Sequence, residues 1–232
     1  MPSVPASNHL LAGLAVSDFA LLQPHLEATD LPLRRGLEYP NKPIQHVYFV
    51  ERGIVSVVAG TRNDGECEIG IVGREGMTGI QILVGSDRSP HQTYVQVAGH
   101  ALRIEAVRLR KIMEESARLR NCLLLFVPAF MAQTAQTAVA NGRAKLEQRL
   151  ARWLLMAHDR VRANTLPLTH EFLSLMLGVR RAGVTDALND LERKKLIRTA
   201  RGEIVVLDRK GIERTAGGTY GTPEAEFRRL IG

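Results

Sequence analysis

The chain has 232 residues, a formal net charge of +7 and a hydrophobic fraction of 45%, which is ordinary for a soluble globular protein of one or two domains. No uninterrupted apolar run approaches the roughly 20 residues of a membrane-spanning helix, and the N-terminus lacks the basic segment of a signal peptide. The two cysteines, Cys67 and Cys122, have no metal-ligand spacing. We therefore expect a cytoplasmic, reduced protein without a membrane partner or a metal site.

The positive charge is confined to one part of the chain. Residues 1–141 contain 13 Lys and Arg and 13 Asp and Glu, whereas residues 142–232 contain 18 Lys and Arg and 11 Asp and Glu. A basic C-terminal part beside a neutral N-terminal part indicates a polyanionic partner for the former. The alternative is a basic solvated surface that binds nothing.

The first half of the chain is rich in short strands. A short helix over "DFALLQPHL" precedes a segment from about Gln45 to Ile104, in which "HVYFVERGIVSVVAG", "ECEIGIVGREGMTG" and "TYVQVAGHALRI" alternate apolar and polar residues. The turn signals "NDG", "GRE", "GSDRSP" and "AGH" separate these runs. This pattern predicts an antiparallel β-sandwich or barrel.

A helical segment with almost no glycine follows, from about Val107 to Arg162. It predicts a long helix, a break at "NGR" (Asn141–Arg143) that would act as a hinge, and a second helix, with a kink at Pro128. Its first part carries an apolar stripe at Leu119, Leu123, Phe126 and Phe130. The stripe fits either a core helix lying on the barrel or a coiled-coil-like dimer interface, and the second interpretation is slightly favoured.

The segment "LTHEFLSLMLGVRRAGVTDALNDLERKKLI", from Leu168 to Ile197, is the strongest functional signal. Two helical runs flank Gly178, and Thr169 is suited to cap the first of them. The inward positions of the runs are Leu173, Met176 and Leu177, then Val184, Leu188 and Leu191. A small hairpin or wing, "LIRTARGEIVVLDRKG", comes next. These elements predict a winged helix-turn-helix whose second helix enters the DNA major groove.

The outward positions of the second helix supply the candidate DNA contacts. Arginine suits a bidentate contact with guanine, and Asn or Thr can contact other base edges. Asp186 would repel phosphates, so we expect it to accept from a cytosine amino group or to orient an arginine. The candidate DNA-binding residues are Thr169, Arg180, Arg181, Thr185, Asp186 and Asn189. A purely structural helical hairpin is the alternative.

The order of barrel, long helix, hinge, helix-turn-helix and wing resembles the Crp/Fnr family of bacterial transcription regulators. The resemblance extends from about Asn8 to Asp208 and is most specific in the two-helix segment and in "GRAKLEQRLARWLL" before it. It implies an α+β fold with an antiparallel jelly-roll barrel and a C-terminal winged helix-turn-helix. It also implies a homodimer joined along the long helix at Leu119, Leu123, Phe126 and Phe130, double-stranded DNA as a partner, a small effector in the barrel, and contact with RNA polymerase.

The implied domains are a sensor barrel at 1–108, a dimerisation helix and hinge at 109–141, and a DNA-binding domain at 142–232. Members of the family typically begin the recognition helix with Arg, then Glu, with a second Arg four residues later. Arg181 matches the first position, but Ala182 and Asp186 occupy the other two. We therefore expect an operator different from that of the cyclic-AMP receptor protein.

The effector pocket departs further from the family pattern. The tentative pocket residues are Gly79, Ile80, Arg88, Ser89, His91 and Gln92. Ile80 replaces the family's ribose-binding glutamate, and His91–Gln92 align with its phosphate-binding Arg-Ser pair, although a loop shift could bring Arg88–Ser89 there. A neutral histidine is a poor substitute for a fixed cation. We expect no certain cofactor and an effector other than a cyclic nucleotide, or none.

Other sensing chemistries and catalysis have little support in the sequence. Two cysteines cannot supply the four ligands of an iron–sulfur cluster, and haem ligation would rest on isolated histidines: His46, His91 or His100. No esterase elbow, phosphate-binding loop or zinc-protease motif occurs, so we expect no enzyme. The rival hypotheses are a ligand-binding or protein-interaction barrel with a vestigial DNA-binding domain, and an enzyme of unrecognised chemistry.

Overall fold

The computed structural model describes residues 7–61, 65–161 and 163–232, and their backbone contacts divide the chain into two units. The first unit comprises residues 1–57, 71–131 and 225–232, and the second comprises residues 58–70 and 132–224. Helices and antiparallel strands are both abundant, so the expected α+β class with a barrel and a winged helix-turn-helix is confirmed.

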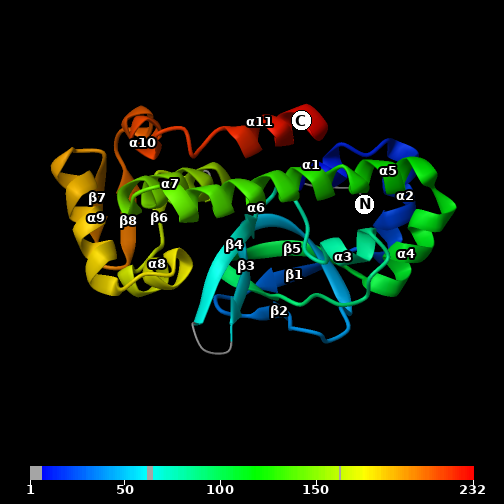
Figure 1. Cartoon of the computed structure of the whole chain (residues 1–232). Helices are drawn as coiled ribbons and strands as arrows, with labels where there is room; N and C mark the ends of the chain where they lie inside the picture. Colours follow the sequence, from blue (N-terminus) through cyan, green and yellow to red (C-terminus); the bar gives the residue numbers. More distant parts are fainter. Residues whose placement is uncertain (1–6, 62–64, 162) are drawn as a thin grey trace. The chain divides into compact units, whose positions relative to one another are not determined.

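A five-stranded sheet dominates the first half of the chain, with the strand order β1-β5-β3-β4 and with β2 also pairing with β5 (Figure 1). The strands are β1 Glu27–Leu31, β2 Gly36–Glu38, β3 His46–Thr61, β4 Gly65–Val72 and β5 Gln92–Glu105. Both β1 and β2 run antiparallel to β5. The alternation in "HVYFVERGIVSVVAG" places apolar side chains such as Phe49 and Val55 in the core of the first unit, where both are fully buried.

The centre of β3 approaches β5 so closely that only glycine fits. A Cβ atom at Gly99 would lie 1.9 Å from the carbonyl oxygen of Arg52, and Gly53 has a φ of +97°, which side chains rarely permit. Arg52–Gly53 is therefore a local distortion within one continuous strand.

Several short helices also belong to the first unit. They are α1 His9–Ala12, α2 Val16–Leu22, the 3-10 helix η1 Gln23–His25, α3 Ile80–Leu83, α4 Ala106–Glu115 and α5 Ala117–Leu124. The expected short helix over "DFALLQPHL" corresponds to α2 and η1. Helix α11, Thr222–Leu230, returns to this unit, where Phe227 packs against its core.

The expected long helix is divided at two points. Helices α4 and α5 are separated at Ser116, and α6, Phe126–Arg143, begins after Leu125. Pro128 lies in the first turn of α6, where a missing N–H costs no helical hydrogen bond, so it produces no kink within a helix. The predicted break at Asn141–Arg143 lies inside α6 as well, and the helix ends only after Arg143.

The proposed dimer stripe faces the core of the first unit. Leu119 and Leu123 are 0% exposed and Phe126 is 3% exposed, and Phe130 packs against the same core. Their assignment to a dimer interface is therefore wrong. The helical spacing was correct, but the barrel covers this face, as the alternative core interpretation predicts.

One segment, Ala117–Arg143, is long and apolar enough to cross a membrane by length and composition. The sequence criterion of an uninterrupted apolar run did not detect it, because polar residues such as Gln133 and Gln136 interrupt the run. Its first part belongs to the core of a globular unit, since Leu119, Leu123 and Phe126 are buried there.

The second unit contains a helical domain with a small sheet. Its helices are α7 Leu146–Val161, α8 His170–Leu177, α9 Arg181–Arg193 and α10 Arg209–Ala216, and its strands are β6 Thr165–Leu166, β7 Ile197–Ala200 and β8 Glu203–Val206. The sheet order is β6-β8-β7, and β7 and β8 form the predicted wing, with antiparallel pairing from Ile197–Val206 to Ala200–Glu203. Helix α7 packs against α9 and α10.

The last residues of β3 and most of β4 also belong to the second unit. Glu68 on β4 and Trp153 on α7 are both buried, and the indole Nε1–H donates to the Glu68 carboxylate at 2.6 Å. A charge-assisted hydrogen bond of this length between buried groups fixes the strand end to the helix.

Leu123→Ala should lower the free energy of unfolding of the first unit by about 2–5 kcal/mol, because it leaves a cavity in a closed core. Val107→Ala on α4, where the side chain is 71% exposed, should change it by less than about 0.5 kcal/mol. Calorimetry of both variants measures the difference. A mild Leu123→Ala phenotype combined with weaker self-association would restore the dimer assignment.

Candidate nucleic-acid interface

The two-helix segment forms the predicted helix-turn-helix. The Thr169 hydroxyl caps α8 by accepting a hydrogen bond from the Phe172 N–H at 3.2 Å. Gly178 ends α8 in the left-handed conformation, with a φ of 61°. The chain then turns, and α9 begins at Arg181, with Arg180 as its N-cap residue.

The inward positions are those expected from the helical spacing. Leu173, Met176 and Leu177 of α8 are buried, as are Val184, Ala187, Leu188 and Leu191 of α9. Gly183, which sequence analysis treated as a costly helical residue, faces the end of the Leu146 side chain, 3.2 Å from where a Cβ atom would lie. The packing therefore leaves the opposite face of α9 to solvent.

That exposed face contains most of the predicted DNA contacts. Arg180, Arg181, Asp186 and Asn189 are exposed, and so is Thr169 at the start of α8. Within the described part of the chain, no side-chain hydrogen bond or ion pair engages Arg180, Arg181, Asp186 or Asn189. In particular, Asp186 pairs with no arginine within the described part of the chain.

Thr185 differs from the other candidates. It is half-buried, and its hydroxyl donates to the Arg181 carbonyl oxygen at 3.1 Å. The hydroxyl oxygen of Thr185 also lies 3.0 Å from Nδ1 of His170. These bonds join α8 to α9. The hydroxyl of Thr185 therefore contributes to the relative orientation of the two helices, and its methyl group is the part left for a contact outside the domain.

The wing adds exposed basic side chains that sequence analysis did not include. Glu192 on α9 accepts hydrogen bonds from the Thr199 N–H at 2.8 Å and from its hydroxyl at 3.0 Å, which holds β7 beside α9. Arg198 and Arg201 on this wing are exposed. The "RTARGE" turn is the sequence feature that could have indicated these two arginines. A wing beside a recognition helix brings its basic residues near the DNA that the helix would bind.

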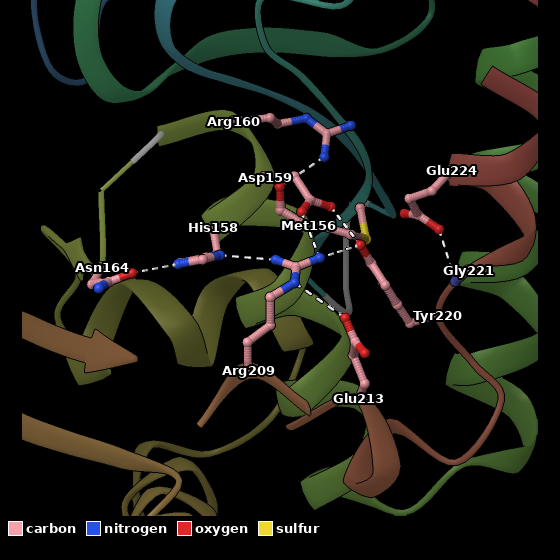
Figure 2. Close-up of polar contacts among 10 residues, drawn as sticks. All are labelled: Met156, His158, Asp159, Arg160, Asn164, Arg209, Glu213, Tyr220, Gly221 and Glu224. Carbon is pink, nitrogen blue, oxygen red and sulfur yellow. Dashed lines mark hydrogen bonds and ion pairs between the residues drawn. The ribbon is translucent and has the colours of Figure 1, made fainter. Parts of the chain in front are cut away.

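A network of polar side chains joins α7, α10 and the segment after α10 (Figure 2). Arg209 on α10 binds Asp159 of α7 at 2.7 Å, Glu213 at 3.1 Å, the Tyr220 hydroxyl at 2.7 Å and His158 Nδ1 at 2.8 Å. The Tyr220 hydroxyl donates to Asp159 at 2.7 Å. Four groups from α7, α10 and the segment after α10 thus meet at one guanidinium.

The pKa values of Arg209 and Tyr220 in this network are shifted. Burial lowers the pKa of Arg209, but the charges of Asp159, Tyr220 and Glu213 and the hydrogen bond to Asp159 together outweigh it and raise that pKa above the ordinary value. Burial and the hydrogen bond to Asp159 both raise the pKa of Tyr220. Both groups therefore keep their protons at neutral pH, and the network serves packing of the domain.

The predicted effector pocket exists only in part. A cavity in the first unit is lined by Gly79, Ile80, Ser89 and His91, whereas Arg88 and Gln92 are not among its lining residues. Arg88 is exposed, 3.1 Å from the Asn41 carbonyl oxygen and 3.5 Å from Asp87. The suggestion that a loop shift brings Arg88 into the pocket does not hold in this structure.

The cavity contains further residues that sequence reasoning missed. They are Glu38, Val57, Val72, Met77, Thr78, Gln81, Thr93, Phe126 and Phe130. They come from strands, a short helix and the start of α6, so no local motif in the sequence joins them.

Comparison with known proteins agrees with this geometry. Residues 148–215 match the model of the Crp-like helix-turn-helix domain. A transcriptional regulator assigned to the Crp/Fnr family from Eubacterium rectale has a similar structure, with a TM-score of 0.70 at 19% identity over 90% of this chain and 98% of its own. The resemblance to the Crp/Fnr family is confirmed. The chain has the fold of these regulators and carries a Crp-like helix-turn-helix domain.

Two further structures support the Crp/Fnr fold. The regulator CLP of Xanthomonas campestris, described as responsive to c-di-GMP, gives a TM-score of 0.68 at 18% identity and covers 83% of this chain and 99% of its own. A CRP-family regulator of Thermus thermophilus gives a TM-score of 0.69 at 19% identity, covering 82% of this chain and 97% of its own. No curated protein sequence matches the chain.

Gly178→Ala should destabilise the second unit by about 1–2 kcal/mol, because a Cβ atom disfavours the left-handed conformation. Gly142→Ala in α6 is the matched control, since open space surrounds its Cβ position and helical Gly→Ala stabilises by about 0.5–1 kcal/mol. Urea unfolding followed by the fluorescence of Trp153, the only tryptophan, measures both. Equal effects of the two substitutions would contradict a special role of Gly178.

Proposed function

We propose that the protein is a sequence-specific, DNA-binding transcriptional regulator. The observation that supports this best is the exposed face of α9, where Arg181, Asp186 and Asn189 have no partner within the described part of the chain. Polar side chains on such a helix can reach base edges in the major groove. The match of residues 148–215 to the Crp-like helix-turn-helix domain supports this role for α9.

The charge distribution along α9 favours selectivity for base sequence over high affinity for the DNA backbone. The helix begins with Arg181 and ends with Arg193, but Asp186, Asp190 and Glu192 lie between them. Acidic groups repel phosphates, so the attraction to the DNA backbone has to come from the flanking cations, including Arg180 and the wing arginines. The operator would then differ from the family's usual half-site at the base opposite Asp186.

We also propose a homodimer, with an interface different from the stripe first expected. Helix α6 exposes Met131 at 64% and Val139 at 52%, with Ala135 exposed between them. These positions are four residues apart and therefore share one face of the helix. A second copy of α6 is the partner that the family resemblance supplies for this apolar face, and the dimer would bind a near-palindromic operator with half-sites about one helical turn apart.

Allosteric control from the first unit is the third element of the proposal. Phe126 and Phe130 at the start of α6 line the cavity of the first unit, and the same helix continues into the second unit. The ends of β3 and β4 meet α7 through Glu68 and Trp153 within the second unit. These two continuous connections are the routes by which an effector could change the DNA-binding domain. A cytoplasmic location and contact with RNA polymerase follow from the family resemblance.

Selection of duplexes from a random DNA pool tests the DNA-binding function, with and without cyclic AMP. The proposal expects a palindromic motif enriched equally in both arms. A motif that appears only with cyclic AMP would mean that a cyclic nucleotide is the effector after all. No enrichment in either arm would favour the rival hypothesis, a ligand-binding barrel with a vestigial DNA-binding domain.

Arg181→Ala should weaken binding to the selected operator by about 1–3 kcal/mol and relax the preference at one base position per half-site. Binding of labelled duplexes measures the change, with the selected site and a scrambled duplex compared. Arg108→Ala on α4, an exposed arginine of the first unit, is the control and should leave both unchanged. An equal loss of affinity for both duplexes would mean that Arg181 contacts only phosphate.

Val139→Asp should shift the protein from dimer to monomer, because it places two carboxylates in an apolar interface. Sedimentation velocity measures the oligomeric state. Val107→Asp, at a position that is 71% exposed on α4, should leave the dimer intact. A dimer that tolerates Val139→Asp would place the interface elsewhere.

A further inference from the structure

His170, the first residue of α8, lies beside the exposed face of α9. Its Nδ1 atom is 3.0 Å from the hydroxyl oxygen of Thr185. Arg181, Thr185 and Asn189 follow one another at intervals of four residues, so they share one face of α9. An imidazole in contact with the middle member of this row therefore borders the face that would enter the major groove.

The hydrogen bonds of Thr185 determine which nitrogen of this imidazole carries a proton. The hydroxyl lies 3.1 Å from the Arg181 carbonyl oxygen, which can only accept, so its single proton is used there. Toward His170 the hydroxyl oxygen can then only accept, and Nδ1 has to donate. In the neutral imidazole the other nitrogen, Nε2, consequently carries a lone pair and no proton.

The Nε2 atom of His170 can meet a group from outside the chain. Among the residues that the structure describes, no group forms a hydrogen bond with it. It is also not one of the described side-chain atoms that are both buried and without a partner. Nε2 therefore reaches solvent, although the residue as a whole is half-buried.

No charged side chain is bonded to the imidazole. The charged residues nearest to this contact along the two helices are Glu171, Arg180, Arg181 and Asp186. All four are exposed, and none forms a hydrogen bond or an ion pair with the ring in the described part of the second unit. Arg149 of α7 also reaches α8, but at its other end, where it donates to the Leu177 carbonyl oxygen. His170 is the only histidine of α8 and α9, and histidine is the side chain that ordinarily changes charge between about pH 5 and 8.

We infer that His170 is a proton-dependent contact to the DNA backbone, in which Nε2–H of the imidazolium donates to a phosphate oxygen while Nδ1 remains bonded to Thr185. In a helix-turn-helix the first helix crosses the backbone beside the groove that the second helix occupies. A neutral His170 would present the lone pair of Nε2 to the phosphate, which repels it. The imidazolium forms a charge-assisted hydrogen bond at the same place.

This inference rests on the proposed function and adds a pH dependence to the same DNA-binding face. Where the imidazole of the free protein is neutral, the complex holds one proton more for each His170 that contacts DNA. A lower pH then favours the complex. Affinity should rise by at most about tenfold per unit fall in pH for each such contact, and level off once the free protein is protonated as well.

The test measures binding of the full-length protein to a labelled mixed-sequence DNA duplex between about pH 6 and about pH 8, at several salt concentrations. A phosphate contact is independent of base sequence, so this duplex reports on it without the operator. Affinity should increase toward low pH. The slope of log affinity against log salt concentration should also become steeper by about 0.9 for each His170 contact, because one more phosphate is neutralised. A histidine that only packs α8 against α9 would leave this slope unchanged.

His170→Asn keeps a donor near the position of Nδ1 but has no Nε2 and no titrating ring. It should lose most of the gain in affinity toward low pH, together with the change in salt slope. His100→Asn, at an exposed histidine of the first unit, is the matched control and should keep the pH dependence of the wild type.

Thr185→Val tests the proton assignment separately and nearly preserves the shape of the side chain. Without the hydroxyl, Nδ1 no longer has to donate, and a neutral ring can carry its proton on Nε2. The pH dependence of binding should therefore shrink in this variant while the phosphate contact persists. Melting temperatures at both pH values show that each variant is folded.

Three results would overturn the inference and leave a DNA-binding function standing. They are an equal salt slope at low and high pH in the wild type, an unchanged pH dependence in folded His170→Asn, and an unchanged pH dependence in folded Thr185→Val. Absence of duplex binding at every pH would overturn the proposed function and the inference together.

Discussion

Helix α6 imposes the constraint on which the rest of the molecule depends, because its residues belong to both compact units. Its first turns bury Phe126 against the core of the first unit, while Met131 and Val139 further along remain largely exposed. One helix therefore has an inner apolar face satisfied within the chain and an outer apolar face that is not. Burial of apolar surface contributes about 25 cal/mol of free energy per Å². The outer face of α6 therefore has a tendency to associate with another apolar surface. Helix α6 thus carries the proposed dimer face and two residues of the cavity lining, Phe126 and Phe130.

On the proposed DNA-binding face, the arrangement of charges would separate affinity from specificity more clearly than a uniformly basic helix does. The acidic groups of α9 reduce non-specific attraction to phosphates, while Asp186 and Asn189 offer an acceptor and an amide to base edges. The positive charge needed for binding lies at the beginning of the helix and on the wing, at Arg180, Arg198 and Arg201. The bonds from Thr199 to Glu192 keep this wing beside the helix, so that backbone and base contacts would form together.

Polar contacts of charged groups hold elements of the second unit together. Glu68 accepts the Trp153 indole N–H, and the Arg209 guanidinium binds the acids and the hydroxyl of its network. Charges satisfied in this way are costly to separate, so these contacts favour a fixed packing of β4, α7 and α10.

The sequence by itself determined the local elements. The helical spacing and Gly178 defined the helix-turn-helix, since an inward face and a left-handed residue are short-range properties that a run of thirty residues reveals. Strand alternation and the "RTARGE" turn likewise defined the sheet and the wing. Charge counting was enough to direct attention to the C-terminal part, because net charge is additive along the chain.

Only the tertiary structure decided which side of each apolar helix is covered. The stripe from Leu119 to Phe130 has the spacing of an interface and of a core helix alike, and the presence of the barrel selects the core. Glu38, Gln81 and Phe126 come together from β2, α3 and α6, so their common cavity has no signature in the sequence. The bond between Glu68 and Trp153 joins residues 85 positions apart for the same reason. Periodicity shows that a face is apolar or polar, but long-range packing alone determines what lies against it.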